Sequence, residues 1–494
     1  MNTVQRMALG IVLLAFGCSS GGDVPRTVLD AEVPLDLRSP LTPDLAPADT
    51  GGTGGTGGTG GTALGSGGTS GATGGNGGGV DAFDAPIDQP SVGDAAAEGP
   101  PTMDAAADQA AAAANFFQLS IIHRIEITID PALWQQFMQE HATAATVPVW
   151  RQADFKIDGV ALSNVGFKTF GFGSRLFAPN KPNLNLDLNK YSKGQSLMGL
   201  SRMRIKNNGQ DPSGLRQAIT YEALAAAGLG APRATFAQLF VNNEAYGFYT
   251  VEETFTSGFV YQRTGNENGA AYEANDCQGF VAPTVGGCAA ILDYYQRSFN
   301  PLVGKGEDLV ALCTAMNGPP EQFMAAVAPL IDLDEWVPMV AALTALAGDY
   351  DGFSTNGNNF RLYHDTATNK LHLYVFGPDV TYDPDYLPLP DPLKPAPGMD
   401  CAARNPAYRD IFLEKLQATA AGADLYQQAA KKLRAGVMSA ARMKSRVDTL
   451  WSLMGDAAKA DPRRVTTPPD PETSKEQIKT FLDARALQLE AAGL

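Results

Sequence analysis

Hydrophobic and polar residues alternate along much of residues 116–253, as they do in strands that bury one face. The alternation is strict in NLNLDLNKY, where every second residue from Leu184 to Leu188 is a leucine. Four further segments share the pattern: LSIIHRIEITID, ADFKIDGVALSNVGFKTFG, LSRMRIKNN and ATFAQLFVNNEAYGFYTVEE. Two of them contain turn dipeptides and are predicted hairpins, at Asp158-Gly159 and at Asn242-Asn243. These segments predict an antiparallel sheet with one buried face.

A helical period of hydrophobic residues appears in the intervening segments. PALWQQFMQEHA has it directly after the first strand, and residues 212–228 have it after the fifth. Helical patterns dominate residues 309–347 and 409–494, interrupted by the strand pair NFRLYHDTATNKLHLYVF. The order predicts an α+β fold, with an antiparallel-sheet N-terminal part and a mainly helical C-terminal part.

The composition divides the chain at about residue 115. Residues 19–115 consist largely of Gly, Thr, Ala, Pro and Asp, and they carry thirteen acidic residues against two arginines. A segment with so little apolar surface cannot offset the entropy of ordering, so we expect a disordered tether. The remaining residues, 116–494, carry a net charge of only −6. They show no basic patch, so we expect no nucleic-acid partner.

The first 18 residues resemble a secretory signal. An apolar run follows a single arginine and is too short to cross a bilayer permanently. The run ends at Gly-Cys, which resembles a bacterial lipoprotein signal whose cysteine, Cys18, becomes lipidated. A plain cleaved signal is the alternative. We therefore expect residues 116–494 to form a domain tethered to the membrane outside the cytoplasm, in the bacterial cell envelope or at the surface.

Four further cysteines fit an oxidising compartment, because their number is even. Cys277 and Cys288 bracket a loop rich in Gly and Pro, so their pairing is the first expectation. Cys313 and Cys401 then pair by elimination. A zinc site is the rival, but no cysteine pair has CxxC spacing and the four histidines form no ligand pattern.

The stretch DYDGFSTNGNN, residues 349–359, carries the clearest chemistry. Asp351 and Asn356 have the D-x-x-x-x-N spacing of the protein-kinase catalytic loop, in which Asp accepts a proton and Asn binds a metal. After the next strand pair, GPDVTY places Asp379 where a kinase has its second, metal-binding Asp. Carboxylate and amide oxygens suit magnesium. The alternative is that these acids only terminate helices and turns.

The chain from residue 116 to residue 494 resembles the CotH kinase-like family of secreted or lipoprotein-type atypical kinases. A Lys-Pro strand, an Asn-rich segment, an Arg-bearing helix and the hairpin LFVNNEAYGFYTVEE match its long signature. GDYDGFSTNGNNFRLYHD resembles its catalytic loop, and FGPDVTY resembles its metal-binding turn. The resemblance implies a kinase-like fold, ATP with magnesium or manganese, and phosphorylation of Ser or Thr in an exported or envelope protein.

The resemblance also implies roles for individual residues. Asp351 is the expected catalytic base, Asn356 a metal ligand, and Asp379 the principal metal ligand. The nucleotide-binding candidates are Lys181, its rival Lys168, Glu222 as the acid that orients the lysine, and Glu252 near the adenine. The alternatives are that Lys181 only precedes a strand, that Glu222 faces solvent, and that Glu252 ends a hairpin.

The sequence also departs from the family pattern. Many members have PWDxD at the metal-binding turn, whereas this chain has VFGPD, with Gly377 in place of the first Asp. Loss of that carboxylate would weaken metal binding, so a nucleotide-binding pseudokinase is the second hypothesis. The third is a structural or adhesion lipoprotein of the envelope without transfer activity.

Overall fold

The computed structural model describes residues 112–143, 146–274, 279–283, 286–299, 303–384, 391–394, 410–465 and 469–494. All of these residues belong to one compact unit, Asp81–Leu494. The expected signal segment with Cys18, most of the expected tether, and also Cys277 and Cys401 lie outside them. No helix in the described ranges combines the length and the apolar character needed to cross a membrane.

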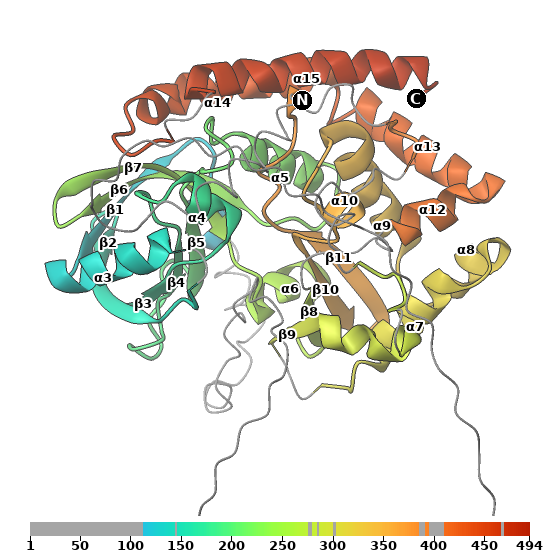
Figure 1. Ribbon diagram of the computed structural model, residues 1–494, viewed down its shortest axis with the longest axis horizontal. Helices are drawn as coiled ribbons and strands as arrows, with labels where there is room; N and C mark the ends of the chain where they lie inside the picture. Colours follow the sequence, from blue (N-terminus) through green and yellow to red (C-terminus); the bar gives the residue numbers. More distant parts are fainter. Residues whose placement is uncertain are drawn as a thin grey trace, which may run out of the picture. The chain divides into compact units, whose positions relative to one another are not determined.

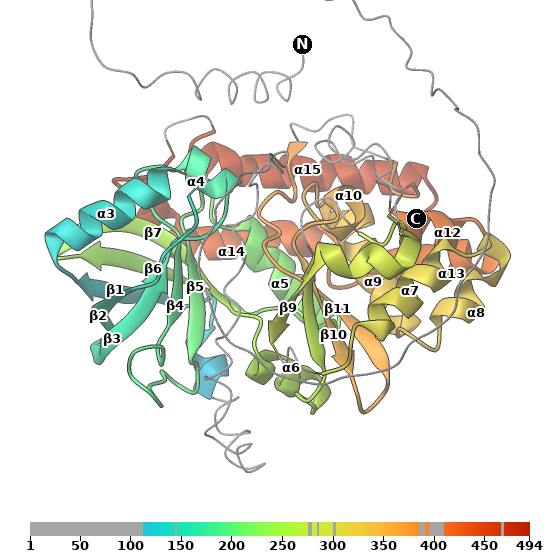
Figure 2. The ribbon, with the colours of Figure 1, turned by 60° about the horizontal axis from the view of Figure 1, so that its bottom comes forward.

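Seven strands close into a barrel in the order β1-β2-β3-β4-β5-β7-β6 (Figures 1 and 2). Their bounds are β1 Ile122–Thr128, β2 Arg151–Ile157, β3 Val160–Lys168, β4 Leu184–Asp187, β5 Arg202–Lys206, β6 Ala234–Val241 and β7 Glu244–Glu253. Neighbouring strands are antiparallel except for β1 and β6, which run parallel with Ile122 opposite Phe236. The mixed α+β class is confirmed. The prediction of an antiparallel sheet is wrong in two respects. The sheet closes into a barrel, and β1 and β6 pair in parallel.

Local sequence accounts for the barrel's hairpins and its buried face. Asp158 and Gly159 have φ of 49° and 87°, and Asn242 and Asn243 have φ of 48° and 69°. Tight two-residue hairpin turns require positive φ at both central positions, which Asn, Asp and Gly tolerate best. The alternating leucines of β4 are fully buried in the barrel core. The predicted alternation is therefore correct at β4, whereas the last eight residues of β7 are all buried.

A helix covers one side of the barrel. In α3, Pro131–Ala142, the Asp130 side chain accepts hydrogen bonds from the amides of Ala132 and Leu133, which caps the helix start. Trp134 and Phe137 of α3 belong to the barrel core. A short helix, α4 Gly173–Phe177, follows β3.

A second sheet lies in the C-terminal half of the described chain, with strand order β11-β10-β8-β9. Its strands are β8 Ala270–Ala274, β9 Tyr295–Phe299, β10 Phe360–Asp365 and β11 Lys370–Val375. The hairpin of β10 and β11 was predicted. Strands β8 and β9 were not predicted, because AAYEA and YQRSF are short and lack regular alternation.

Helices surround this second sheet and connect it to the barrel (Figure 1). The central helix is α5, Arg216–Ala226. The others are α6 Ser257–Thr264, η1 Gly287–Tyr294, α7 Glu307–Asn317, η2 Pro320–Gln322, α8 Phe323–Val327, α9 Leu333–Val340, η3 Ala341–Ala347, α10 Phe353–Asn356, α12 Ile411–Gln417, α13 Ala420–Ala435, α14 Ala440–Lys459 and α15 Pro471–Ala491. In Figure 1, α14 and α15 run side by side past both β7 and α5.

The described residues form three hydrophobic core clusters. One fills the barrel, a large one joins α5 to the second sheet and the C-terminal helices, and a small one of mainly aromatic residues lies around Phe255 and Phe259. Trp336 of α9 is fully buried in the large cluster, and its indole N–H donates to the carbonyl of Leu371 at 2.8 Å. This bond positions α9 against β11, and α9 continues through η3 into the loop that begins at Asp349.

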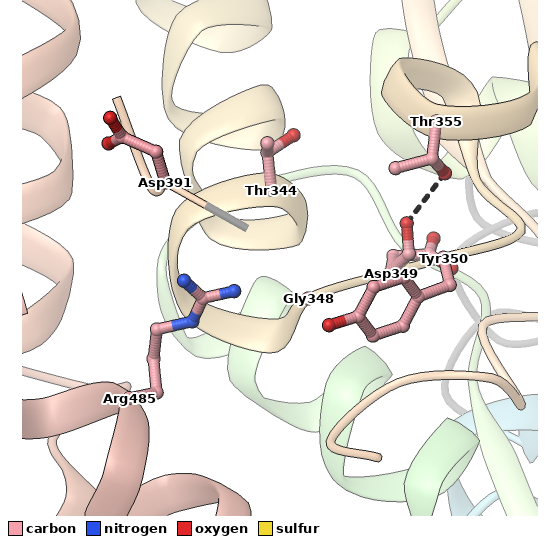
Figure 3. A pocket seen from close by; sticks show the side chains of 7 residues that line it. All are labelled: Thr344, Gly348, Asp349, Tyr350, Thr355, Asp391 and Arg485. Atoms are coloured by element: carbon pink, nitrogen blue, oxygen red, sulfur yellow. Dashed lines mark hydrogen bonds between the residues drawn. The ribbon is translucent and has the colours of Figure 1, made fainter. Parts of the chain in front are cut away.

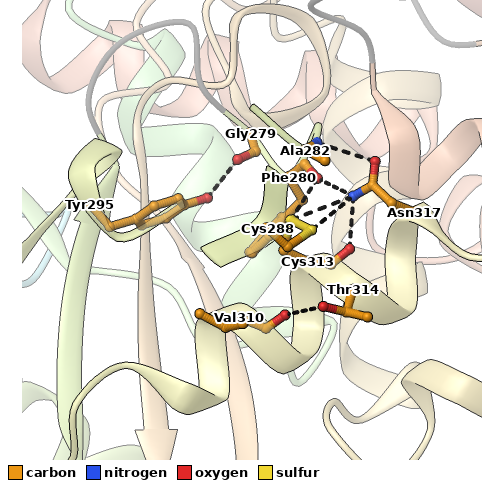
Figure 4. The surroundings of a disulfide bond; sticks show 9 residues. All are labelled: Gly279, Phe280, Ala282, Cys288, Tyr295, Val310, Cys313, Thr314 and Asn317. Atoms are coloured by element: carbon orange, nitrogen blue, oxygen red, sulfur yellow. Dashed lines mark hydrogen bonds between the residues drawn. A yellow bond between two sulfur atoms is a disulfide. The ribbon is translucent and has the colours of Figure 1, made fainter. Parts of the chain in front are cut away.

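A disulfide joins Cys288 of η1 to Cys313 of α7 (Figure 4). Both expected pairings, Cys277 with Cys288 and Cys313 with Cys401, are therefore wrong. The packing of η1 against α7 brings the two Cα atoms to 5.6 Å, which is within the range that a disulfide spans. The side-chain amide of Asn317 donates to the carbonyls of Phe280 and Cys313 at 2.8 and 2.7 Å and fixes the surrounding loop.

Candidate active site

The loop 349–359 begins where η3 ends. Gly348 closes the helix in the left-handed conformation, with φ 59°, which favours glycine. A single turn, α10, follows and ends at Gly357, also left-handed. The amide of Tyr350 donates to the carbonyl of Val380, and the amide of Phe376 donates to the carbonyl of Asn359. These bonds bring the loop next to the turn that carries Asp379.

Three asparagine side chains surround the carboxylate of Asp351. Asn356 and Asn358 donate to its Oδ1 at 2.9 and 3.3 Å, and Asn359 donates to its Oδ2 at 2.9 Å. A second bond from Asn359 reaches the Asp351 carbonyl at 2.9 Å. Amide donors stabilise an ionised carboxylate and fix its orientation. The asparagines of this stretch therefore hold one acid in a defined position.

Asp349 occupies a different environment two residues earlier. Asp349 is 3% exposed, and it lines a small cavity with Thr344, Gly348, Tyr350, Thr355, Asp391 and Arg485 (Figure 3). Burial, followed by the negative charge of Asp351, raises the pKa of the Asp349 carboxyl well above its ordinary value, although the Asp351 amide opposes the shift. A Cβ at Gly352 would lie 2.2 Å from Asp349 Oδ2, so any other residue there would force the Asp349 side chain to move.

Asp379 forms an ion pair with Lys206, the last residue of β5. Lys206 Nζ lies 2.8 Å from Asp379 Oδ2, and both side chains are largely buried. Burial lowers the pKa of Lys206, but Asp379 and Glu252 outweigh it, and the net pKa is raised. The turn begins at Gly377, with φ 70°, and Asp379 N donates to the Gly377 carbonyl at 2.8 Å. Lys206 is thus a charged lysine between two acids.

Glu252, near the end of β7, is 1% exposed and accepts hydrogen bonds from two residues of α5. Gln217 Nε2 lies 2.6 Å from its Oε2, and the Tyr221 hydroxyl lies 3.1 Å from the same oxygen. Arg204 of β5 is a more distant ion partner, at 3.7 Å from Oε1. Glu252 therefore belongs to the same polar cluster as Lys206 and joins the barrel to α5.

The structure does not bring the other expected nucleotide-binding residues into this cluster. The Lys181 ammonium pairs with Asp461 Oδ2 and donates to the Phe248 carbonyl, both at 2.6 Å. Lys168 lies over the Trp150 ring at 5.0 Å. Glu222 faces α14, where its carboxylate accepts from Arg446 at 2.6 Å. Lys181 therefore forms its ion pair with Asp461, and among the described residues it forms none with Asp351 or Asp379.

The side chains present suit a metal that arrives with phosphate oxygens. Among the described residues, no group of three or more His, Cys, Asp or Glu side chains could hold a metal unaided. Magnesium commonly takes one or two carboxylates and completes its shell with phosphate and water. Asp379 offers a carboxylate beside the loop, and the Asn356 amide, whose nitrogen bonds Asp351, offers its oxygen. The donor set fits a metal–nucleotide complex better than a free ion.

Sequence reasoning missed Lys206, Gln217 and Tyr221. Lys206 stands in LSRMRIKNN, which reads only as a strand, and its role depends on Asp379 far along the chain. Gln217 and Tyr221 lie four residues apart in α5, so they share one helical face. A glutamine and a tyrosine at this spacing were a usable signal for a buried acid partner.

Comparisons with known proteins point to a kinase family. A family model described as CotH kinase protein matches residues 167–489, more than half of the chain. A solved structure, the Helicobacter pylori proinflammatory kinase CtkA, matches with 12% sequence identity and a TM-score of 0.30. That match covers 63% of this chain and 92% of the other. A search of curated proteins finds no match.

Proposed function

Because the chain belongs to the CotH kinase family, we propose that it transfers the γ-phosphate of ATP to serine or threonine hydroxyls of an exported or envelope protein. The observation that carries the proposal is the Asp351 carboxylate, fixed by three asparagine amides beside the Lys206–Asp379 pair. Phosphoryl transfer needs mainly positioning and charge neutralisation, and this cluster supplies both.

Each side chain then has a chemical task. Asp351 accepts the proton of the attacking hydroxyl, and its amide donors hold the carboxylate in one orientation. Asp379 and the Asn356 oxygen hold magnesium or manganese, which neutralises charge on the transferring phosphate when bound. Lys206 contributes a second positive charge, in the place for which Lys181 was expected.

A pseudokinase is the second candidate, and one contact favours it. Gly377 stands where many members have an acid, and the remaining Asp379 is paired with Lys206 at 2.8 Å. Metal binding must compete with this ion pair for the carboxylate. A domain that binds nucleotide without transfer would then act as an envelope scaffold, and the third hypothesis, an adhesion lipoprotein, requires no nucleotide at all.

The proposed location is extracytoplasmic, with the membrane reached through a lipid on Cys18. The sequence of residues 1–18 supports it, and so does the Cys288–Cys313 disulfide, because disulfides persist in oxidising compartments. Labelling with a radioactive fatty acid in bacteria, with a Cys18→Ser control, tests the anchor. Label retained by the Cys18→Ser chain would rule it out.

The test of transfer uses the purified full chain with γ-labelled ATP and either magnesium or manganese. We expect autophosphorylation or labelling of a generic protein, lost in both Asp351→Asn and Asp379→Asn. Asp456→Asn, a change at an exposed acid of α14, is the matched control. Labelling that survives in Asp351→Asn would remove this residue as the base. Nucleotide binding without transfer would identify the pseudokinase, and no binding would leave the adhesion reading.

A further inference from the structure

Helix α5 follows the segment 377–383 along its length. Near the helix start, Arg216 Nη1 lies 3.0 Å from Asp383 Oδ2. One turn later, the hydroxyls of Thr220 and Thr381 lie 3.4 Å apart. The next residue, Tyr221, accepts a hydrogen bond from the Gly377 amide at 2.8 Å. Three contacts from one helix therefore position the segment that contains Asp379.

The Tyr221 contact differs from the other two, because it continues into the barrel. Its hydroxyl accepts from Gly377 N and donates to Glu252 Oε2 at 3.1 Å, so both hydrogen-bonding functions of the phenol are used. The residue is 2% exposed. Burial and the nearby Glu252 raise the pKa of the hydroxyl well above its ordinary value, which keeps it a donor. One oxygen atom thus connects α5, β7 and the turn.

The connected amide belongs to the residue from which the turn starts. Gly377 is left-handed, and its carbonyl accepts from the amide of Asp379. A backbone amide that loses its hydrogen-bond acceptor is unfavourable. The turn would therefore move to find another acceptor if the Tyr221 hydroxyl were absent. Such a movement shifts the Asp379 carboxylate relative to Asn356.

We propose that Tyr221 is a positioning residue that holds the Gly377–Asp379 turn in its metal-binding geometry. The inference rests on the proposed function, since it concerns the metal of the same site. In this proposal α5 acts on the site through the neutral Tyr221 hydroxyl. The sequence had instead suggested Glu222, as the acid that orients the nucleotide-binding lysine. Glu222 itself bonds Arg446 on the other side of the helix. The helix thus acts on the metal-binding turn through the Gly377 amide.

The test is manganese binding by the full chain, measured by electron paramagnetic resonance with a non-hydrolysable ATP analogue. In Tyr221→Phe we expect affinity to fall roughly tenfold, which corresponds to about 1.4 kcal/mol. The ring remains, so packing is preserved. The matched control is Tyr249→Phe, since Tyr249 is also fully buried but its hydroxyl has no hydrogen-bond partner among the described residues. We expect unchanged manganese affinity in this control.

A merely structural role predicts another pattern. It would lower the thermal midpoint of Tyr221→Phe and leave manganese affinity at the wild-type value, which would overturn the proposal. Equal losses in Tyr221→Phe and Tyr249→Phe would overturn it as well. If the wild-type chain binds manganese with the analogue but transfers no phosphate, the proposed kinase activity is wrong. The ratio of manganese affinities between the wild type and Tyr221→Phe still decides the role of Tyr221. A wild-type chain that binds no manganese would overturn both.

A second measurement needs no substitution. Amide hydrogen exchange of the wild-type chain reports on peptides that contain Gly377. We expect this amide to be protected, and to become roughly tenfold slower when manganese and the analogue bind, because the turn is then held from both sides. Exchange at the rate of an exposed loop, with or without ligand, would contradict a bond to Tyr221 that positions the turn.

Discussion

Two lysines of the same barrel form buried ion pairs of almost the same length but in opposite surroundings. Lys181 lies 2.6 Å from Asp461, and Lys206 lies 2.8 Å from Asp379. The first pair has side chains 3% exposed on each partner, whereas those of the second are 11% and 13% exposed. The second pair therefore retains some access to solvent and to ligands, and the first does not.

Their partners explain the difference. Asp461 follows α14 and also accepts from the amides of Phe248 and Arg463, so its pair with Lys181 connects the C-terminal helices to the barrel. Burial outweighs Asp461 and lowers the pKa of Lys181, while two acids raise that of Lys206. Lys181 has one acid for one base. Lys206 is shared between acids, which suits a group that exchanges partners when a ligand binds.

The largest expected effect comes from breaking the Lys181 pair. Asp461→Ala leaves the buried Lys181 ammonium with the Phe248 carbonyl and the Tyr249 ring but no acid partner among the described residues. Loss of one member of a buried pair costs about 3–5 kcal/mol. Urea unfolding of the full chain measures it. The same substitution at exposed Asp456 should change the free energy of unfolding by less than about 0.5 kcal/mol. A small effect of Asp461→Ala would mean that the connection carries little of the stability.

The next effect separates the lysines by activity. Lys206→Met removes a positive charge next to the metal-binding acid, and we expect a loss of roughly 10²–10³ in kcat, about 2.7–4 kcal/mol, as for other charge-stabilising donors. Lys181→Met is the reciprocal control. It should lower stability while the folded fraction retains its activity. The reverse pattern, with kcat lost only in Lys181→Met, would restore Lys181 as the nucleotide lysine.

Features that depend on residues close together in the sequence were the most predictable parts of the molecule. The hairpins at Asp158-Gly159 and Asn242-Asn243 were predictable, because turn geometry depends on the residues of the turn itself. Asp351 and Asn356 were recognisable as one motif, because their spacing falls within one short loop, but the hydrogen bond between them was not predicted. Barrel closure by β1 and β6 was not, since alternation tells which face is buried but not which strand is adjacent.

Ion partners distant in sequence were the least predictable. Nothing local distinguishes Lys181 before β4 from Lys206 at the end of β5, and only the folded chain brings Asp461 to one and Asp379 to the other. The prediction of the disulfide pairing was wrong for the same reason. Cys277 and Cys288 are close along the chain, but the packing of η1 on α7 places Cys313 beside Cys288.

We expect the free energy of unfolding to depend on pH through His141, on the Lys181 side of the barrel. His141 of α3 is fully buried, with its ring nitrogens bonded to Thr169 and the Ala178 carbonyl, and burial lowers its pKa from 6.5 to about 4. The unfolded chain binds this proton more readily. The contribution of His141 is therefore complete above pH 6.5 and is lost as pH falls toward 4, by at most about 3 kcal/mol.

Unfolding free energies of the wild type and His141→Gln at pH 7.5, 5.5 and 4.5 measure this contribution. The difference between the two chains should shrink as pH falls, because glutamine does not titrate. A difference that is constant across the range would show that His141 binds its proton equally well in both states. In that case the Lys181–Asp461 ion pair, and not His141, would account for the difference between the Lys181 and Lys206 sides of the barrel.

The smallest expected effect concerns the residue that departs from the family pattern. A Cβ at Gly377 would lie 3.3 Å from Asn359 Oδ1 and 3.4 Å from Lys206 Nζ, so the carboxylate of Gly377→Asp would reach Lys206. It would compete with Asp379 for the ammonium and release Asp379 toward the metal. We expect manganese affinity with nucleotide to rise about threefold. The left-handed φ should cost about 1–2 kcal/mol of stability. Gly377→Asn shares the strain but not the charge, so a gain in both variants would assign the effect to the backbone and not to the Lys206 pair.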